Sequence, residues 1–151
     1  MRQWLMKSEP DVFGLDDLKQ QGSTWWDGVR NYQARNFMRD DMQIGDKVLF
    51  YHSNSKPSGV AGLATVIHTA TPDSTSWDPE SDYYDPKSSP DQPRWWHVQL
   101  GYKAHFKRLV PLAELRAIPV LADMPLLNRS RLSIQPVSSE DYALIVRLGQ
   151  A

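Results

Sequence analysis

The sequence is most distinctive at residues 25–36, where it reads Trp25-Trp26-Asp27-Gly28-Val29-Arg30-Asn31-Tyr32-Gln33-Ala34-Arg35-Asn36. Two indole rings lead into a glycine turn, and a carboxamide, a phenol and two guanidinium groups follow. Proteins bind a flipped or single-stranded base by stacking it on an aromatic face and by hydrogen bonds to its edge. The stretch therefore favours a flat, polar, anionic ligand such as a nucleobase on its phosphate backbone.

The second half of this stretch predicts a helix from Tyr32 to about Asp41. Asn31 is a favoured N-cap residue, and apolar residues recur at helical spacing from Ala34 to Met42. The Asn31 amide also offers a donor and an acceptor together, which suits it to reading the edge of a base. The sequence leaves both roles open, and one residue can serve both.

The flanking sequence predicts a mixture of short strands and short helices. Alternating or β-branched stretches predict strands at residues 3–6, 47–51, 60–68, 94–102, 105–110 and 131–135. Capping residues and helical spacing predict helices at residues 15–21, 111–116 and 138–148, with a further short element at 124–127. This order predicts an α+β fold with a small, strongly curved sheet or barrel of five to six strands flanked by helices.

Length and composition predict one ordinary globular domain. The chain has 151 residues, 40% of them hydrophobic and 23% charged, and it contains no cysteine. No apolar run approaches the length of a membrane span, so we expect an intracellular, cytoplasmic protein with no membrane partner. The four histidines are scattered and no glycine-rich phosphate loop is present, so we expect no metal and no cofactor. Nothing demands an oligomer, and a monomer is the expectation.

The charge of the chain is unevenly distributed. The net charge is −1, but six acids and only one base, Lys87, fall between Asp73 and Asp91. The rest of the chain carries 16 bases and 12 acids and is therefore mildly basic. This balance permits phosphate contacts but does not predict tight binding driven by charge alone.

Several motifs along the chain resemble, in order, those of the EVE domain family. They include residues 4–10 (WLMKSEP), 26–36 (WDGVRNYQARN), 50–54 (FYHSN), 59–63 (GVAGL), 110–115 (VPLAEL) and 132–136 (LSIQP). The resemblance covers essentially the whole chain. It implies a single domain over residues 1–151 with a PUA-like fold, a twisted β-barrel with helices packed around it. The Pro- and Asp-rich stretch at about 71–93 then becomes a long acidic surface loop.

The same resemblance implies a function. EVE domains are related to YTH domains, which hold a methylated adenine in an aromatic cage, and they are thought to read modified bases in DNA or RNA. We therefore expect a non-enzymatic module whose partner is a nucleic acid carrying a modified base. The preferred modification, and the choice between DNA and RNA, do not follow from the sequence.

Candidate ligand-binding residues follow from the motifs and from the ends of predicted strands, which PUA-like folds can bring to one mouth. Trp26 is the candidate stacking wall, whereas Trp25 points the other way if the segment is extended. Arg30 and Arg35 are candidate phosphate ligands. The remaining candidates for the pocket are Lys7, Ser8, Asn31, Tyr32, His52, Ser53, Ser133, Gln135 and Pro136.

Two alternative functions stay open. ASCH domains, which are related to EVE domains, include amidohydrolases that use Lys and Glu on modified nucleosides, and here Lys7 and Glu9 would take those roles. We assign no catalytic residue in the preferred, binding interpretation. A protein-interaction module is the third class, with Trp77, Tyr83 and Tyr84 of the acidic loop as its contact surface. The same three rings can instead cover the barrel or close over the pocket.

Overall fold

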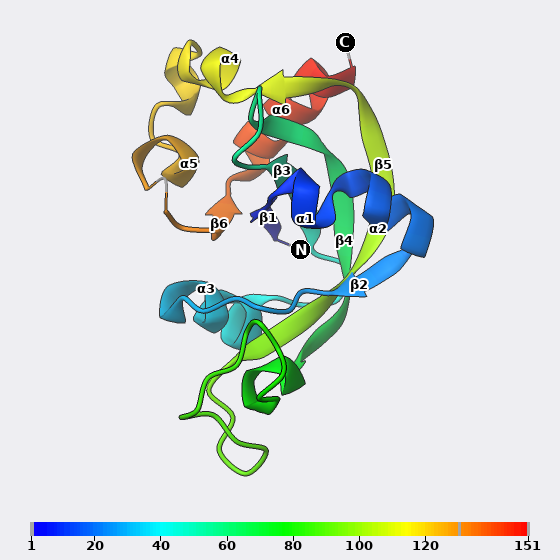
Figure 1. Ribbon diagram of the computed structural model, residues 1–151. Helices are drawn as coiled ribbons and strands as arrows, with labels where there is room; N and C mark the ends of the chain where they lie inside the picture. Colours follow the sequence, from blue (N-terminus) through cyan, green and yellow to red (C-terminus); the bar gives the residue numbers. More distant parts are fainter. Residues whose placement is uncertain (1, 130, 151) are drawn as a thin grey trace.

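One six-stranded mixed sheet organises the computed structural model, which describes residues 2–129 and 131–150 (Figure 1). The strands are β1 (Gln3–Ser8), β2 (Ser23–Trp25), β3 (Lys47–His52), β4 (Gly59–Pro72), β5 (Trp96–Pro111) and β6 (Ile134–Val137). They pair in the order β2-β5-β4-β3-β1-β6. Only β1 and β3 run parallel to each other, and the other neighbours are antiparallel.

The sheet is open, and the closed barrel expected from the sequence is not formed. Among the described residues, β2 and β6 each pair with a single neighbour and lie at the two ends of the sheet. Both strands are short, and Pro136 in β6 has no N–H to offer to a further strand. The expected mixture of strands with flanking short helices is confirmed.

Short helices cover both faces of this sheet. They are α1 (Pro10–Phe13), α2 (Leu15–Gln21), α3 (Tyr32–Asn36), α4 (Leu112–Arg116), α5 (Pro125–Asn128) and α6 (Ser139–Gln150). A π-helical turn at Phe37–Asp41 continues α3, and 3-10 turns lie at Ser74–Trp77 and Pro119–Leu121. Figure 1 shows α4 and α6 at one end of the molecule and α3 toward the other.

Alternation along the central strands creates two apolar cores. Trp4 and Met6 of β1 face one core with Phe50, while Leu5 faces the other with Leu49. The first core is completed by α2 and α3, and the second by α4, α5 and α6. The sheet is therefore buried on both faces, which makes β1 and β3 a rigid support for the residues at their ends.

Most predicted elements are confirmed, and the differences have local causes. The helix at Leu15–Gln21 has the predicted bounds. The two strands predicted at 94–102 and 105–110 are one strand, β5, whose register against β4 shifts at several points and interrupts its alternation. The last strand lies at Ile134–Val137 rather than 131–135. The short elements α1 and β2 were not predicted, because three or four residues carry little periodicity.

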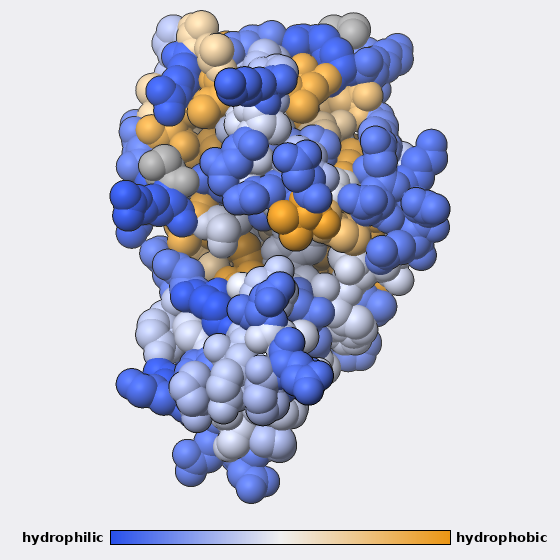
Figure 2. Space-filling view, in the orientation of Figure 1, coloured by the Kyte–Doolittle hydropathy of each residue, from blue (hydrophilic) through white to orange (hydrophobic). Residues whose placement is uncertain are grey.

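The segment of residues 73–95, which we call the acidic loop, joins β4 to β5. In Figure 1 it is the green segment that extends from the lower end of the sheet. Figure 2 shows a hollowed band between this mostly hydrophilic lower part and an upper part that carries most of the visible apolar surface. This segment lies where the sequence predicts a long acidic surface loop, at about residues 71–93.

A buried carboxylate anchors the start of the chain to the turn before β3. Asp46 is 3% exposed, and its two oxygens accept hydrogen bonds from the Trp4 indole at 3.0 Å, the Gln43 N–H at 3.0 Å and the Arg2 N–H at 3.1 Å. A charge removed from water in this way is tolerated because several donors surround it.

Removing this anchor should destabilise the protein. Asp46→Ala leaves the Trp4 indole N–H buried without an acceptor, so we expect the free energy of unfolding to fall by about 2 kcal/mol. Asp41→Ala is the control, since Asp41 forms only a partly exposed ion pair with Arg2 at 3.7 Å and should cost less than about 0.5 kcal/mol. Urea unfolding measures both, and equal losses in the two variants would contradict this role of Asp46.

Candidate functional site

Two adjoining hollows lie between the end of β1, helix α1 and the loop that follows β2. The larger one, the main hollow, has a volume of about 380 Å³ and brings together Lys7, Ser8, Trp26, Arg30 and Ser133, all of them predicted from the sequence. The smaller one, the side hollow, has a volume of about 280 Å³ and shares Ser8 and Trp26 with it. The main hollow lies within the ~300–1,000 Å³ range of small-molecule sites.

The polar floor of the main hollow comes from strand ends. The Lys7 N–H donates to the Ser133 carbonyl at 2.9 Å, which fixes the start of β6 against β1. The Ser8 hydroxyl donates to the Phe13 carbonyl at 2.6 Å and thereby fixes α1 above it. Burial lowers the pKa of the Lys7 amine. The predicted meeting of strand ends at one mouth therefore holds for these residues.

Two aromatic rings of unequal exposure line the main hollow. Trp26 is 8% exposed, because most of its ring packs edge-on against Phe50 in the core, with centroids 5.6 Å apart. Tyr83, from the acidic loop, is 40% exposed. It lies against Gly28, where an added Cβ would come within 2.7 Å of the tyrosine ring and where φ is +82°. Tyr83 therefore offers the more open aromatic surface, and Gly28 makes its position possible.

Trp25 also borders this site, although an extended strand would have pointed its side chain away from that of Trp26. It lines the side hollow and stacks on His97 of β5, with ring centroids 4.6 Å apart. The alternation ends here because β2 stops at Trp25 and the Asp27 N–H turns back to donate to the Trp25 carbonyl at 2.9 Å.

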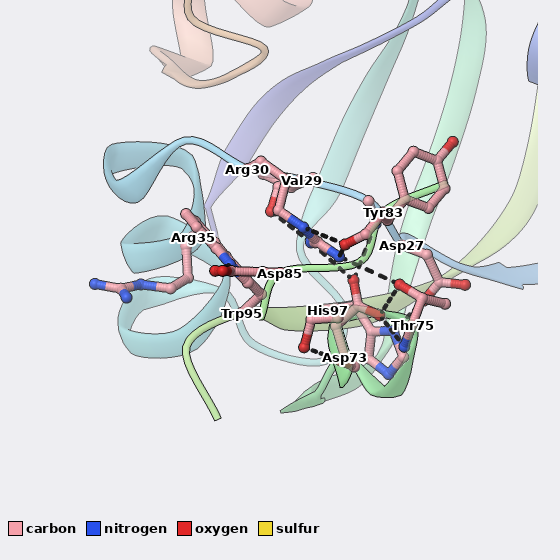
Figure 3. A network of polar contacts seen from close by, with 12 residues as sticks. Asp27, Val29, Arg30, Arg35, Asp73, Thr75, Tyr83, Asp85, Trp95 and His97 are labelled. Atoms are coloured by element: carbon pink, nitrogen blue, oxygen red, sulfur yellow. Dashed lines mark hydrogen bonds and ion pairs between the residues drawn. The ribbon is translucent and has the colours of Figure 1, made fainter. Parts of the chain in front are cut away.

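A network of polar contacts ties the acidic loop to residues 27–30 (Figure 3). The Arg30 guanidinium donates to the Tyr83 carbonyl at 2.7 Å, to Thr75 Oγ1 at 3.3 Å and to Asp73 Oδ2 at 3.2 Å. Asp73 is fully buried and also accepts from the Gly28 N–H at 3.0 Å. Arg30 is thus occupied by protein partners, and its proposed contact with phosphate stays a prediction.

The network favours the charged form of Asp73. Burial alone would raise its pKa, but hydrogen bonds from Thr75 and Gly28 and the charge of Arg30 more than offset this and hold the pKa below its ordinary value. Asp73, Asp27 and His97 have ligand atoms within 4.8 Å of one another, as a metal site requires. However, both Asp73 oxygens already accept hydrogen bonds and one lies next to Arg30. This arrangement suits a hydrogen-bonded joint better than a cation site.

Asn31 caps α3, as predicted. Its Oδ1 accepts a hydrogen bond from the Ala34 N–H at 2.9 Å. The residue also lines a third hollow of about 360 Å³ beside the main one, which we call the basic hollow because Arg129 and Arg131 lie in its wall. Reading of a base by Asn31 stays a prediction, and the structure places its side chain next to the main hollow rather than in it.

Tyr32 and Arg35 lie on the side of α3 toward the acidic loop, outside the main hollow. Tyr32 is 48% exposed and stacks on Trp95, with centroids 4.8 Å apart. The Arg35 guanidinium lies 4.7 Å from the Tyr32 ring and donates to the Arg94 carbonyl. Burial and the neighbouring Arg39 lower the pKa of Arg35. The contact of Arg35 with phosphate stays a prediction.

The remaining predicted residues do not line the main hollow. His52 Nε2 accepts from the Leu15 N–H at 3.1 Å and so fixes the start of α2, while burial lowers its pKa. Ser53 donates its N–H to the Ser8 carbonyl at 3.0 Å. Gln135 is fully buried and donates to the Leu132 carbonyl, and Pro136 is exposed on β6. His52, Ser53 and Gln135 thus use these groups within the fold.

Sequence reasoning did not select several residues that line these hollows. Asp27 lies within the quoted motif and lines both the main and the side hollow. Arg129 and Arg131 precede the last strand, and neither belongs to a motif. Tyr83 was considered as one of three rings of the loop that could bind a partner, cover the barrel or close over the pocket, and it lines both hollows. Its Asp- and Pro-rich surroundings gave no signal of where the loop would fold back.

Comparisons with known proteins identify the family of this chain. The EVE domain model matches residues 2–148. The chain belongs to the EVE domain family. Thymocyte nuclear protein 1 of zebrafish is 43% identical over 166 residues, which cover 96% of this chain and 71% of the relative.

Solved EVE structures superpose closely on this one. A hypothetical protein from Leishmania major has a TM-score of 0.96 at 47% identity, covering 99% of this chain and 95% of its own. The human THYN1 protein, solved in complex with DNA containing 5-methylcytosine, has a TM-score of 0.95 at 41% identity, covering 100% and 99%.

An ASCH protein from Zymomonas mobilis is similar in fold alone. It has a TM-score of 0.56 at 12% identity, covering 98% of this chain and 99% of its own.

Among the described residues, no helix is both long and apolar enough to cross a membrane.

The Asp73 joint generates a prediction about stability and pH. Asp73→Asn should lower the free energy of unfolding at neutral pH by about 1–3 kcal/mol, because a buried charged acceptor is lost. The folded-state pKa of Asp73 is lowered, so its stabilisation is complete above the unfolded value of about 4 and is lost as the pH falls below it.

Denaturant unfolding between pH 7 and pH 3 tests this, with Asp91→Asn as a control at an exposed carboxylate of the same loop. The difference between wild type and Asp73→Asn should shrink below about pH 4. A difference that stays constant across this range would contradict the electrostatic role.

Proposed function

We propose that this chain is a single EVE module, over residues 1–151, that binds DNA by taking one modified base into the main hollow without chemical change. The solved THYN1 complex supports the choice of ligand, since that protein is 41% identical and was solved with DNA containing 5-methylcytosine. The observation that carries the proposal for this chain is the meeting of Lys7, Ser8, Trp26 and Ser133 in one hollow that Tyr83 also lines.

The hollow has the chemistry that a flipped base needs. Tyr83 and the exposed edge of Trp26 supply aromatic surface, and base stacking on such rings contributes about 1–3 kcal/mol per base. Lys7, Ser8 and Ser133 supply polar groups for the edge of the base. A methyl group buried against the rings adds about 0.8 kcal/mol, or about a fourfold gain in affinity.

The DNA backbone then has two basic surfaces beside the hollow. Arg35 forms no ion pair within the described residues and lies on the outer side of α3. Arg129 and Arg131 line the basic hollow, whose walls continue those of the main hollow along residues 29–33 and 131–133. We propose that phosphates on either side of the flipped nucleotide contact these arginines.

Removing the Tyr83 ring should weaken binding directly. Tyr83→Ala should raise the Kd for DNA with one 5-methylcytosine by about fivefold or more, because one stacking surface is lost. Tyr84→Ala is the matched control, since Tyr84 is equally exposed but does not line the hollow. Trp26→Ala is less informative because it also empties part of the core.

Fluorescence anisotropy with a labelled duplex measures this effect, and the same duplex with unmodified cytosine gives the preference for the modification. The proposal fails if the modified and unmodified duplexes bind equally. If Tyr84→Ala loses as much affinity as Tyr83→Ala, the hollow is not the binding site.

The backbone contacts predict a change in salt dependence. Arg35→Ala and Arg131→Ala should each reduce the slope of log K against log salt concentration by about one, whichever base is present. Arg147→Ala, on the exposed side of α6, should leave the slope unchanged. A titration over a range of salt concentrations measures all three variants. If Arg35→Ala and Arg131→Ala have the wild-type slope, the DNA backbone does not contact these arginines.

Three further expectations from the sequence stay predictions, namely RNA as a second ligand, a monomeric state and a cytoplasmic location. The name of the animal relatives refers to a nuclear protein. The amidohydrolase hypothesis keeps one observation in its favour, namely that Lys7 and Glu9 both line the main hollow. The amidohydrolase hypothesis would be supported by the release of product from an acylated nucleoside.

A further inference from the structure

Asp27 is a carboxylate of the main hollow to which the proposed binding of a modified base gives no role. It directly follows Trp26 and lines both the main and the side hollow. Its side chain is 37% exposed, in contrast to the fully buried Asp73 behind it. A carboxylate aimed at a ligand space must be held in place if it is to contribute to selectivity.

His97 holds Asp27 in that position. The ring nitrogen Nδ1 of His97 contacts Asp27 Oδ1, and the imidazole is itself fixed by stacking on Trp25 at 4.6 Å. His97 lies near the start of β5, paired with Thr71 of β4, and is only 9% exposed. Figure 3 shows Asp27 and His97 next to each other within the network.

The second oxygen of Asp27 accepts no hydrogen bond from any described residue. An ionised carboxylate offers acceptors only. The other carboxylate of the main hollow, Glu9, already accepts a hydrogen bond from Asn54 at 2.7 Å. Glu9 thus also keeps one oxygen without a partner among the described residues, and Asp27 differs from it in lining both hollows and in being held by a nearly buried histidine.

We infer that Asp27 reads the exocyclic amine of the bound base and selects cytosine or adenine over thymine and uracil. The inference rests on the proposed function. An amine on the base edge donates to the carboxylate, as cytosine N4 does to acidic side chains. Thymine presents a carbonyl oxygen at the same position, so two acceptors would face each other with no proton between them.

Thymine and 5-methylcytosine provide the sharpest comparison, since both carry the methyl group and they differ at the amine. Single-stranded oligonucleotides are the probe, because no base pair has to open in either of them. The intact chain should bind the strand with one 5-methylcytosine at least about fivefold more tightly than the strand with thymine at that position.

Asp27→Asn tests the residue itself. The amide keeps the size of the side chain but adds a donor, which can meet the thymine carbonyl. The ratio of the two Kd values should therefore fall to about one or invert. A merely structural role would weaken both ligands alike and leave the ratio unchanged. Glu9→Gln is the matched control and should keep the wild-type ratio.

The outcomes separate the inference from the function beneath it. If 5-methylcytosine binds better than cytosine but no better than thymine, the inference is overturned and the proposed function stands. If Glu9→Gln changes the ratio as much as Asp27→Asn, the inference is also overturned. If neither modified nor unmodified DNA binds, the proposed function fails and the inference with it.

Discussion

The candidate site depends on one buried carboxylate, Asp73. It lies at the end of β4 and accepts hydrogen bonds from Gly28, Thr75 and Arg30, so it joins the loop after β2 to the acidic loop. Without Asp73 these two loop segments, which both line the main hollow, would lose the hydrogen bonds that join them. Burying a charge is costly unless several donors surround it, and here those donors come from segments more than forty residues apart. The same contacts that make the burial tolerable therefore set the shape of the hollow.

The hollow has a rigid side and a loop side. Lys7, Ser8 and Ser133 are attached to β1 and β6, in a sheet that is buried on both faces. Tyr83 belongs to the acidic loop, which Arg30 holds through Asp73 and the Tyr83 carbonyl. Within this loop the Trp95 indole donates to Asp85 at 2.7 Å. The polar groups for a base edge thus come from the sheet, while Tyr83 comes from a loop that hydrogen bonds to Gly28 and Arg30 hold in place. The acidic charge of that loop explains why the chain has a net charge near zero and yet presents arginines beside the hollow.

Much of the fold could be read from local patterns, and much of the site could not. The Leu15–Gln21 helix, the Asn31 cap and the strand at Lys47–His52 follow from spacing and capping within a few residues. The extent of β5 was missed because its register shifts blur the alternation on which the prediction relied. For the site, Lys7, Ser8, Trp26 and Ser133 were selected through family motifs and strand ends. His52 and Gln135 come from equally distinctive motifs, but their side chains are used to fix a helix and a turn.

The amino-acid sequence alone was sufficient for the mixed α+β architecture, for the EVE family and for the residues of the 25–36 motif, because these depend on short-range order along the chain. The openness of the sheet, the burial of most of the Trp26 ring and the return of Tyr83 to Gly28 depend on contacts between distant segments. The role of Arg30 is the clearest case. A guanidinium in a basic motif suggests phosphate, but here Asp73 and the Tyr83 carbonyl occupy it, forty or more residues further along the chain. No local pattern encodes which donor a buried carboxylate will meet, and packing alone settles that choice.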